Sequence, residues 1–211
     1  MADKKENEIY MLSYTKDGAQ EIIPCVLVRS RRRTFGISVG EDGDVTLRLP
    51  LRAGSAQAKR MAEEKKDWIY EKVMQQRERA KKRREHERQM EEKYTPAQRQ
   101  ALEKRYRQAA REYIPKRVSY YAQMLGVTYG TIRIAQQKTR WGSCSSSGTL
   151  SFHWKLMLAP PRVLDYVVVH ELCHRKEMNH SPRFWALVEE ILPDYKELRK
   201  WLAEHGSTLD V

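Results

Sequence analysis

The chain has 211 residues, 40% of them hydrophobic and 32% charged, so it can form one domain with an appendage or two very small domains, but no large multidomain assembly. Lys and Arg number 40 against 28 Asp and Glu, and the net charge of +12 favours polyanionic partners such as nucleic acid, nucleotides or an acidic membrane surface. No stretch approaches the roughly 20 apolar residues of a membrane span, and the first residues lack the apolar run of a signal peptide, so we expect a cytoplasmic protein. The three cysteines are widely spaced, and we expect reduced thiols at Cys25, Cys144 and Cys173.

The segment from Glu21 to Leu51 has the alternation of apolar and polar residues that is typical of strands. The turn sequence Glu41 to Asp44 predicts a hairpin connection, and Ser55 is a candidate N-cap for a following helix. We therefore expect a small antiparallel sheet in an N-terminal β-element at residues 1–54.

Residues 55–94 are predicted to form a helical connector, because no Gly or Pro occurs between Ala56 and Lys93. An apolar stripe is present only in the first half of this segment, and beyond Gln75 the sequence mixes Arg, Lys and Glu. This second half is either an arm that binds polyanions or a solvated helical spacer. The interspersed glutamates favour the spacer, since they weaken the positive field.

The remaining residues, 95–211, are predicted to form one further domain. Thr95 and Pro96 are typical of a helix start, Pro115 is expected to kink or split this helix, and Gly126 to end it. Strands are predicted at Thr131–Ala135 and Leu150–Leu158, around a loop at Gly142–Gly148. Pro160 and Pro161 then open another helix.

That helix contains the pattern His170-Glu171-Leu172-Cys173-His174. Residues four apart lie one turn apart on the same helix face, so both imidazoles can reach one ion, and Zn²⁺ suits two such nitrogens. Glu171 is rotated by about 100° from His170, which places it as a general base toward a metal-bound water rather than as a third ligand.

A catalytic zinc site needs a third protein ligand, and two positions are candidates. His180 follows His174 by six residues, just beyond the helix. Glu189 or Glu190 on the next predicted helix is the alternative, although a Glu on a charged surface helix is more often solvated. The sequence favours His180.

The motif at His170–His174, the segment from Asn179 to Trp185 and the upstream segment from Lys138 to Cys144 resemble the YgjP-like family of predicted zinc metallopeptidases. The resemblance extends over nearly the whole chain and includes the Arg-rich stretch around Arg29–Arg33. The YgjP-like family is itself distantly similar to the SprT-like and WLM proteases. It implies a zincin-like fold, Zn²⁺ held by His170, His174 and His180, and Glu171 as catalytic base. Relatives have also been described as nucleoside-triphosphate pyrophosphatases.

Several neighbours of the motif are further candidates. Tyr166 precedes His170 by one turn on the same face and can orient a ligand or stabilise an oxyanion. Arg140 and Trp141 are expected to border the site, and the Leu150–Leu158 strand to pair with an extended peptide. His153, Phe184 and the remaining apolar residues are expected to be packing residues.

Together these observations predict an α+β protein: an N-terminal β-element, a long charged helix and a catalytic domain of helices on a small antiparallel sheet. The expected activity is zinc-dependent hydrolysis of a protein or peptide substrate. The alternative is hydrolysis of nucleoside triphosphates at the same site, with phosphates neutralised by Arg140 or by the arginines of Arg29–Arg33.

Overall fold

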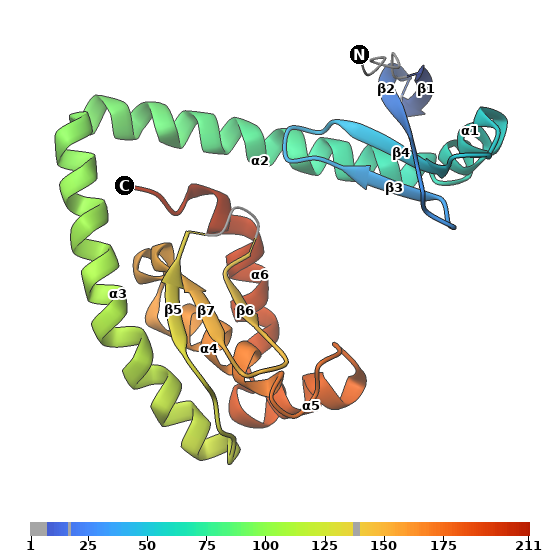
Figure 1. Ribbon diagram of the computed structural model, residues 1–211. Helices are drawn as coiled ribbons and strands as arrows, with labels where there is room; N and C mark the ends of the chain where they lie inside the picture. The colour runs from blue at the N-terminus through green and yellow to red at the C-terminus, as the bar shows by residue number, and fades with distance from the viewer. Residues whose placement is uncertain (1–7, 17, 137–139) are drawn as a thin grey trace, which may run out of the picture. The chain divides into compact units, whose positions relative to one another are not determined.

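The computed structural model describes residues 8–16, 18–136 and 140–211. They contain six α-helices and two sheets, which confirms the α+β class (Figure 1). The chain divides into two compact units, Met1–Glu85 and His86–Val211, and the division falls inside one helix. In the part of the chain that the structure describes, no helix is long and apolar enough to cross a bilayer.

The N-terminal unit contains a four-stranded sheet in the order β1-β2-β4-β3. Its strands are β1 (Glu8–Lys16), β2 (Ala19–Ser30), β3 (Gly36–Val39) and β4 (Val45–Pro50). The predicted hairpin turn joins β3 to β4, but β2 and β4 run parallel, so the expectation of a wholly antiparallel sheet is wrong. Strand β1 was not predicted from the sequence. Ile9 and Met11 are apolar although they lie on its exposed face, so the strand lacks the alternation of apolar and polar residues that buried Leu12 would otherwise indicate.

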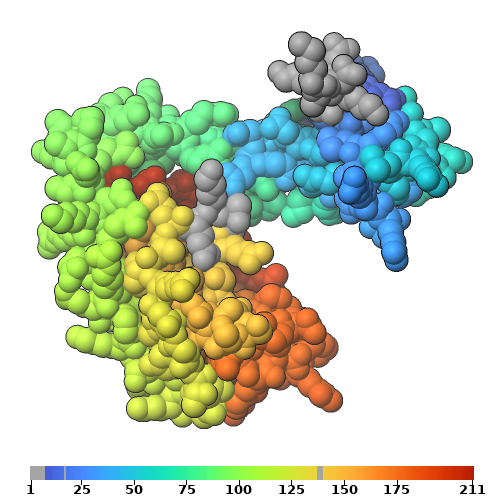
Figure 2. Space-filling view, viewed as in Figure 1, coloured from blue at the N-terminus to red at the C-terminus, as the bar shows by residue number. Residues whose placement is uncertain are grey.

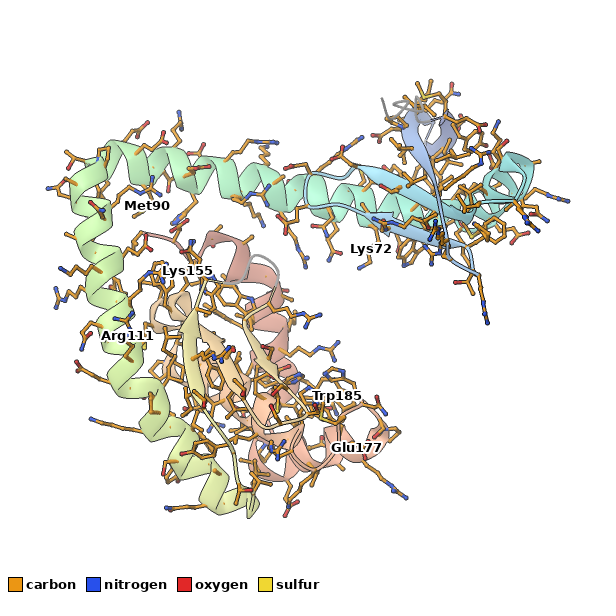
Figure 3. All side chains as sticks on the ribbon, in the orientation of Figure 1. Lys72, Met90, Arg111, Lys155, Glu177 and Trp185 are labelled. Atoms are coloured by element: carbon orange, nitrogen blue, oxygen red, sulfur yellow. The ribbon has the colours of Figure 1, made fainter. Side chains whose placement is uncertain are left out.

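Two helices follow, α1 (Ser55–Glu64) and α2 (Lys66–Lys93), and the break at Lys65 replaces the uninterrupted helix expected there. Gly54, not Ser55, occupies the N-cap of α1. A core forms from one sheet face and these helices. Beyond Val73 only Ala80 of α2 is buried, and side chains project from several sides of the helix between Lys72 and Met90 (Figure 3).

The C-terminal unit begins with the end of α2 and with α3 (Pro96–Leu125). Thr95 caps α3 reciprocally with Gln98, and Gly126 ends it in the left-handed conformation at φ 63°. Of the two outcomes expected at Pro115, a kink or a split, the split does not occur, because α3 continues through this residue. Ile114 and Val118, on either side of Pro115, are fully buried, and this packing compensates for the backbone hydrogen bond that proline cannot make.

A three-stranded sheet contacts α3 through β5 and has the strand order β5-β7-β6. Its strands are β5 (Ile132–Ala135), β6 (Gly142–Cys144) and β7 (Leu150–His153). β6 and β7 are antiparallel whereas β5 and β7 are parallel, so this sheet too is mixed rather than antiparallel.

Two sequence expectations for this sheet are corrected by the structure. The strand predicted at Leu150–Leu158 ends at His153, whose imidazole accepts a hydrogen bond from the Lys155 amide and caps a 3₁₀ helix, η1 (Trp154–Leu158). The predicted loop at Gly142–Gly148 begins with strand β6, and only the rest of it is a turn.

Helix α4 (Pro161–Cys173) is the central element of the unit and contacts α3, α5 (Pro182–Ile191), α6 (Tyr195–His205) and β6. Asp165 of α4 is buried and binds Arg117 of α3 with both carboxylate oxygens, at 2.7 and 2.9 Å. The Tyr121 hydroxyl donates to the same carboxylate at 3.0 Å. This network fixes α4, and with it the His170–His174 motif, against α3.

Candidate metal centre

The His170–His174 motif lies at the end of α4, on the side that faces β6 and α5. His174 is the C-cap residue, and its dihedral angles (φ −63°, ψ −13°) are still helical, so it stays one turn from His170. The two ring centroids are 5.1 Å apart. The His174 Nδ1 is 3.1 Å from the carbonyl oxygen of Glu177, an interaction that orients this ring.

A tight turn after α4 brings His180 back to the motif. Ser181 caps α5 by accepting a hydrogen bond from the Phe184 amide at 3.3 Å. The Nε2 atoms of His180 and His170 are 3.0 Å apart. One ring nitrogen from each of His170, His174 and His180 lies within 4.8 Å of the other two.

This cluster fits a divalent metal ion of the kind that imidazole binds. Burial lowers the pKa of His170 to about 3 and also lowers that of His174, and neutral imidazole is the form that binds metals. Three imidazoles with a pocket beside them match a site that keeps a position open for water or substrate. Within the described ranges Glu189 is instead paired with Lys196, and neither Glu189 nor Glu190 lines the pocket.

Aromatic side chains of α5 pack against the rings of the three histidines. Phe184 is fully buried, and its ring centroid lies 4.6 to 4.9 Å from those of His170, His174 and His180. Trp185 stacks on His180 at 5.7 Å. α5 therefore places the loop histidine by packing, the role expected for Phe184.

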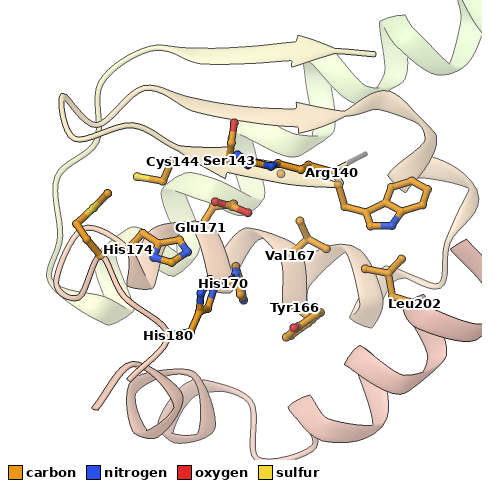
Figure 4. A pocket seen from close by; sticks show the side chains of 13 residues that line it. Arg140, Ser143, Cys144, Tyr166, Val167, His170, Glu171, His174, His180 and Leu202 are labelled. Atoms are coloured by element: carbon orange, nitrogen blue, oxygen red, sulfur yellow. Dashed lines mark hydrogen bonds between the residues drawn. The ribbon is translucent and has the colours of Figure 1, made fainter. Parts of the chain in front are cut away.

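Glu171 points to the other side of the motif, toward β6 (Figure 4). Its side chain is almost completely buried, and this burial raises the pKa to about 8 against the opposing effect of the Arg140 charge. A Cβ atom on Gly142 would come within 2.6 Å of the Glu171 carboxylate, so the backbone of β6 lies directly on this group.

A cavity of about 500 Å³ connects these groups. It is lined by Arg140, Trp141, Gly142, Ser143, Cys144, Tyr166, Val167, His170, Glu171, His174, Met178, His180 and Leu202. The three histidines, Glu171 and the further candidates Tyr166, Arg140 and Trp141 are all in this lining. Burial raises the pKa of Tyr166 to about 12, so its hydroxyl is protonated at neutral pH.

Other residues singled out in the sequence lie elsewhere. His153 is buried beside Trp141 as a packing residue, and Cys173 is buried in α4. Arg29–Arg33 belong to the N-terminal unit, and Lys138 and Thr139 lie outside the described residues.

Val167, Met178 and Leu202 of the cavity were missed from the sequence. They are ordinary apolar residues of the helices and of the turn after α4, and no local pattern separates them from core positions.

Comparison with known proteins assigns the chain to a family. A family model described as "YgjP-like, metallopeptidase domain" matches residues 75–205. A search of curated proteins gave no match.

Two solved structures are similar. The metallopeptidase zymogen abylysin of Pyrococcus abyssi is 25% identical with a TM-score of 0.39, covering 41% of this chain and 89% of its own. The zymogen jannalysin of Methanocaldococcus jannaschii is 22% identical with a TM-score of 0.38, covering 41% and 90%. Because its family model matches well over half of the residues, the chain belongs to the YgjP-like metallopeptidase domain family.

Proposed function

We propose that the chain is a zinc-dependent peptidase with His170, His174 and His180 as metal ligands and Glu171 as general base. The observation that carries the proposal is the convergence of three imidazole nitrogens within 4.8 Å, in the cavity that the Glu171 side chain also lines. Family membership supports a metal-dependent peptidase, and the all-nitrogen ligand set favours zinc.

Zinc held by these histidines would polarise the scissile carbonyl and lower the pKa of water toward about 7. Glu171 accepts the proton of the attacking water and returns it to the leaving nitrogen. The close approach of Gly142 limits where the carboxylate can move. The Tyr166 hydroxyl is a donor at neutral pH and serves to orient the substrate or to stabilise the developing oxyanion.

The substrate is proposed to bind as an extended strand along β6. The strand expected to pair with it, Leu150–Leu158, cannot do so: β7 lies between β5 and β6, so both of its edges are occupied. β6 pairs with β7 alone within the described ranges, and it lines the cavity.

The hydrogen-bond pattern of β6 shows which groups face its free edge. The Trp141 carbonyl accepts from His153, and the Ser145 amide donates to Thr149, so the bonded positions on this strand are the odd-numbered residues. The amides and carbonyls of Gly142 and Cys144 therefore point away from β7. They are the groups to which a peptide main chain would bind.

The nucleotide alternative would require phosphate-binding guanidinium groups at the same cavity. In the described lining Arg140 is the one arginine, so the cavity offers a single guanidinium group to a triphosphate. This arrangement favours peptide over nucleoside triphosphate.

The proposal is tested by incubating the full zinc-loaded chain with a peptide library and, in parallel, with nucleoside triphosphates. We expect peptide products in mass spectra, no release of pyrophosphate, and a loss of cleavage of about 10²-fold or more in Glu171→Gln, which cannot accept a proton. Glu171→Gln should keep its zinc. Zinc-dependent pyrophosphate release without peptide cleavage, or full cleavage by Glu171→Gln, would contradict the proposal.

A further inference from the structure

A second hollow, of about 390 Å³, lies beside the metal cavity and shares Ser143 and Cys144 with it. Apart from these two residues it is lined by Arg133, Ser145, Ser147, Thr149 and Ser151. In Figure 2 the yellow atoms of this sheet region lie at the surface of the C-terminal unit. The lining is a guanidinium group surrounded by hydroxyl groups.

The strand register places this hollow on the outer face of the sheet. Arg133, Ser151 and Ser143 are directly opposite one another on β5, β7 and β6, so their side chains share one face. Figure 4 shows Ser143 pointing away from Glu171. On the neighbouring positions, Phe152 is fully buried and Gly142 lies on Glu171, which marks the opposite face as the inner one.

The electrostatic character of the hollow is positive. Arg133 is exposed and forms no ion pair with any other described residue, and no carboxylate is in the lining. A second guanidinium, Arg175, donates to the carbonyl of Ser146 at 3.1 Å and acts electrostatically on Cys144. A guanidinium group without an ion pair, with hydroxyl groups around it, is the chemistry that binds a carboxylate.

We propose that this hollow is a substrate subsite that accepts an acidic side chain, an inference that rests on the proposed binding of peptide along β6. Successive side chains of an added strand point to opposite faces. When one residue of the substrate faces the metal cavity, its neighbours face the side of the sheet that carries Ser143 and Arg133. The subsite therefore selects residues adjacent in sequence to the one in the metal cavity.

The distance from an added strand to Arg133 on β5 determines which acidic side chain fits better. Strands lie about 4.8 Å apart, so an added strand would be roughly 14 Å from β5 in the hydrogen-bonding direction. The Arg133 side chain covers part of this distance, and a longer acidic side chain covers more of the rest. We therefore expect glutamate to be favoured over aspartate.

The test compares peptides that differ only at the positions adjacent to the residue in the metal cavity, starting from a sequence that the full wild-type chain cleaves. Glu, Asp, Gln and Lys are placed there in turn. We expect kcat/KM to be about three- to fivefold higher with Glu than with Gln, with Lys the poorest, and this difference to fall in KM. The preference should decrease at high ionic strength.

Arg133→Glu should reverse the order of the Glu and Lys peptides, and Arg133→Gln should reduce the difference between them. Arg105→Glu makes the same charge change at an exposed position of α3 outside both hollows and should leave the order unchanged. Equal kcat/KM for all peptides, or an unchanged order in Arg133→Glu with normal zinc content and circular dichroism, would overturn the subsite. If the wild type cleaves no peptide, the proposed function itself fails.

Discussion

Gly142 lies so close to Glu171 that a Cβ atom at this position would stand 2.6 Å from Glu171 Oε1 and 2.7 Å from Cγ. Real Cβ contacts are not that short, so a side chain on residue 142 and the present position of the carboxylate exclude each other. The glycine is needed here for close approach of the backbone, rather than for an unusual backbone conformation.

Gly142→Ala should therefore displace the Glu171 carboxylate or shift β6, and we expect kcat to fall by about tenfold or more. Zinc content should not change, because the three atoms nearest to the added Cβ all belong to Glu171. Gly54→Ala is the matched control, since a Cβ atom there meets nothing within 4 Å. Wild-type kcat in Gly142→Ala would show that the position of the carboxylate does not limit turnover.

The ligand assignment predicts a contrast between histidines and glutamates. His170→Ala, His174→Ala and His180→Ala should each lose stoichiometric zinc, because two remaining imidazoles bind the ion much more weakly than three. Glu189→Ala and Glu190→Ala should keep one zinc per chain. Elemental analysis after dialysis measures both sets, and zinc loss in a glutamate variant with retention in His180→Ala would move the third ligand to α5.

The network between α3 and α4 predicts a stability effect. Asp165→Asn removes the charge that Arg117 faces, and we expect the free energy of unfolding to fall by about 2 kcal/mol, less than for a fully buried pair because the Arg117 side chain is 26% exposed. Breaking the more exposed pair with Asp194→Asn should cost less than about 1 kcal/mol. Urea unfolding followed by tryptophan fluorescence distinguishes the two variants, and equal losses would contradict the prediction.

His153 predicts how stability depends on pH. Burial, with the nearby charges of Lys155 and Arg107, lowers its pKa from 6.5 to about 4. Between these values the unfolded chain binds a proton that the folded chain excludes, so the stabilisation is complete above pH 6.5 and is lost as the pH falls toward 4. The loss is on the order of 3 kcal/mol.

His153→Asn keeps an acceptor that can cap η1 but does not titrate, so its stability should vary less across this pH range. Urea unfolding of both proteins at several pH values between 7 and 4 measures the difference. Parallel curves for wild type and variant would assign the acid sensitivity to other groups.

Local patterns predicted the parts of this molecule that depend on local chemistry. The caps at Thr95 and Gly126 and the helical spacing of His170 and His174 are set by residues within one or two turns, and the structure contains them. The approach of His180 was also predictable, because a short turn after the helix leaves few other paths.

Features that depend on residues far apart in the chain could not be predicted from local sequence patterns. The parallel pairing of β5 with β7 and the continuity of α3 through Pro115 are decided by packing against elements far along the chain. Leu202 lines the cavity because α6 packs on α4. The need for glycine at position 142 follows from its contact with Glu171, which is far away in the sequence. Neither residue carries a motif.

In the proposed mode of peptide binding, the shortness of β6 also limits which substrates can be bound. Its three residues present the main-chain groups of only Gly142 and Cys144 to an incoming strand. A target whose amides and carbonyls are already engaged in its own helices or sheets would have to give up those bonds for a few at this edge, an unfavourable exchange. For the proposed activity we therefore expect native globular proteins to be poor substrates, and tails, linkers and unfolded chains to be cleaved.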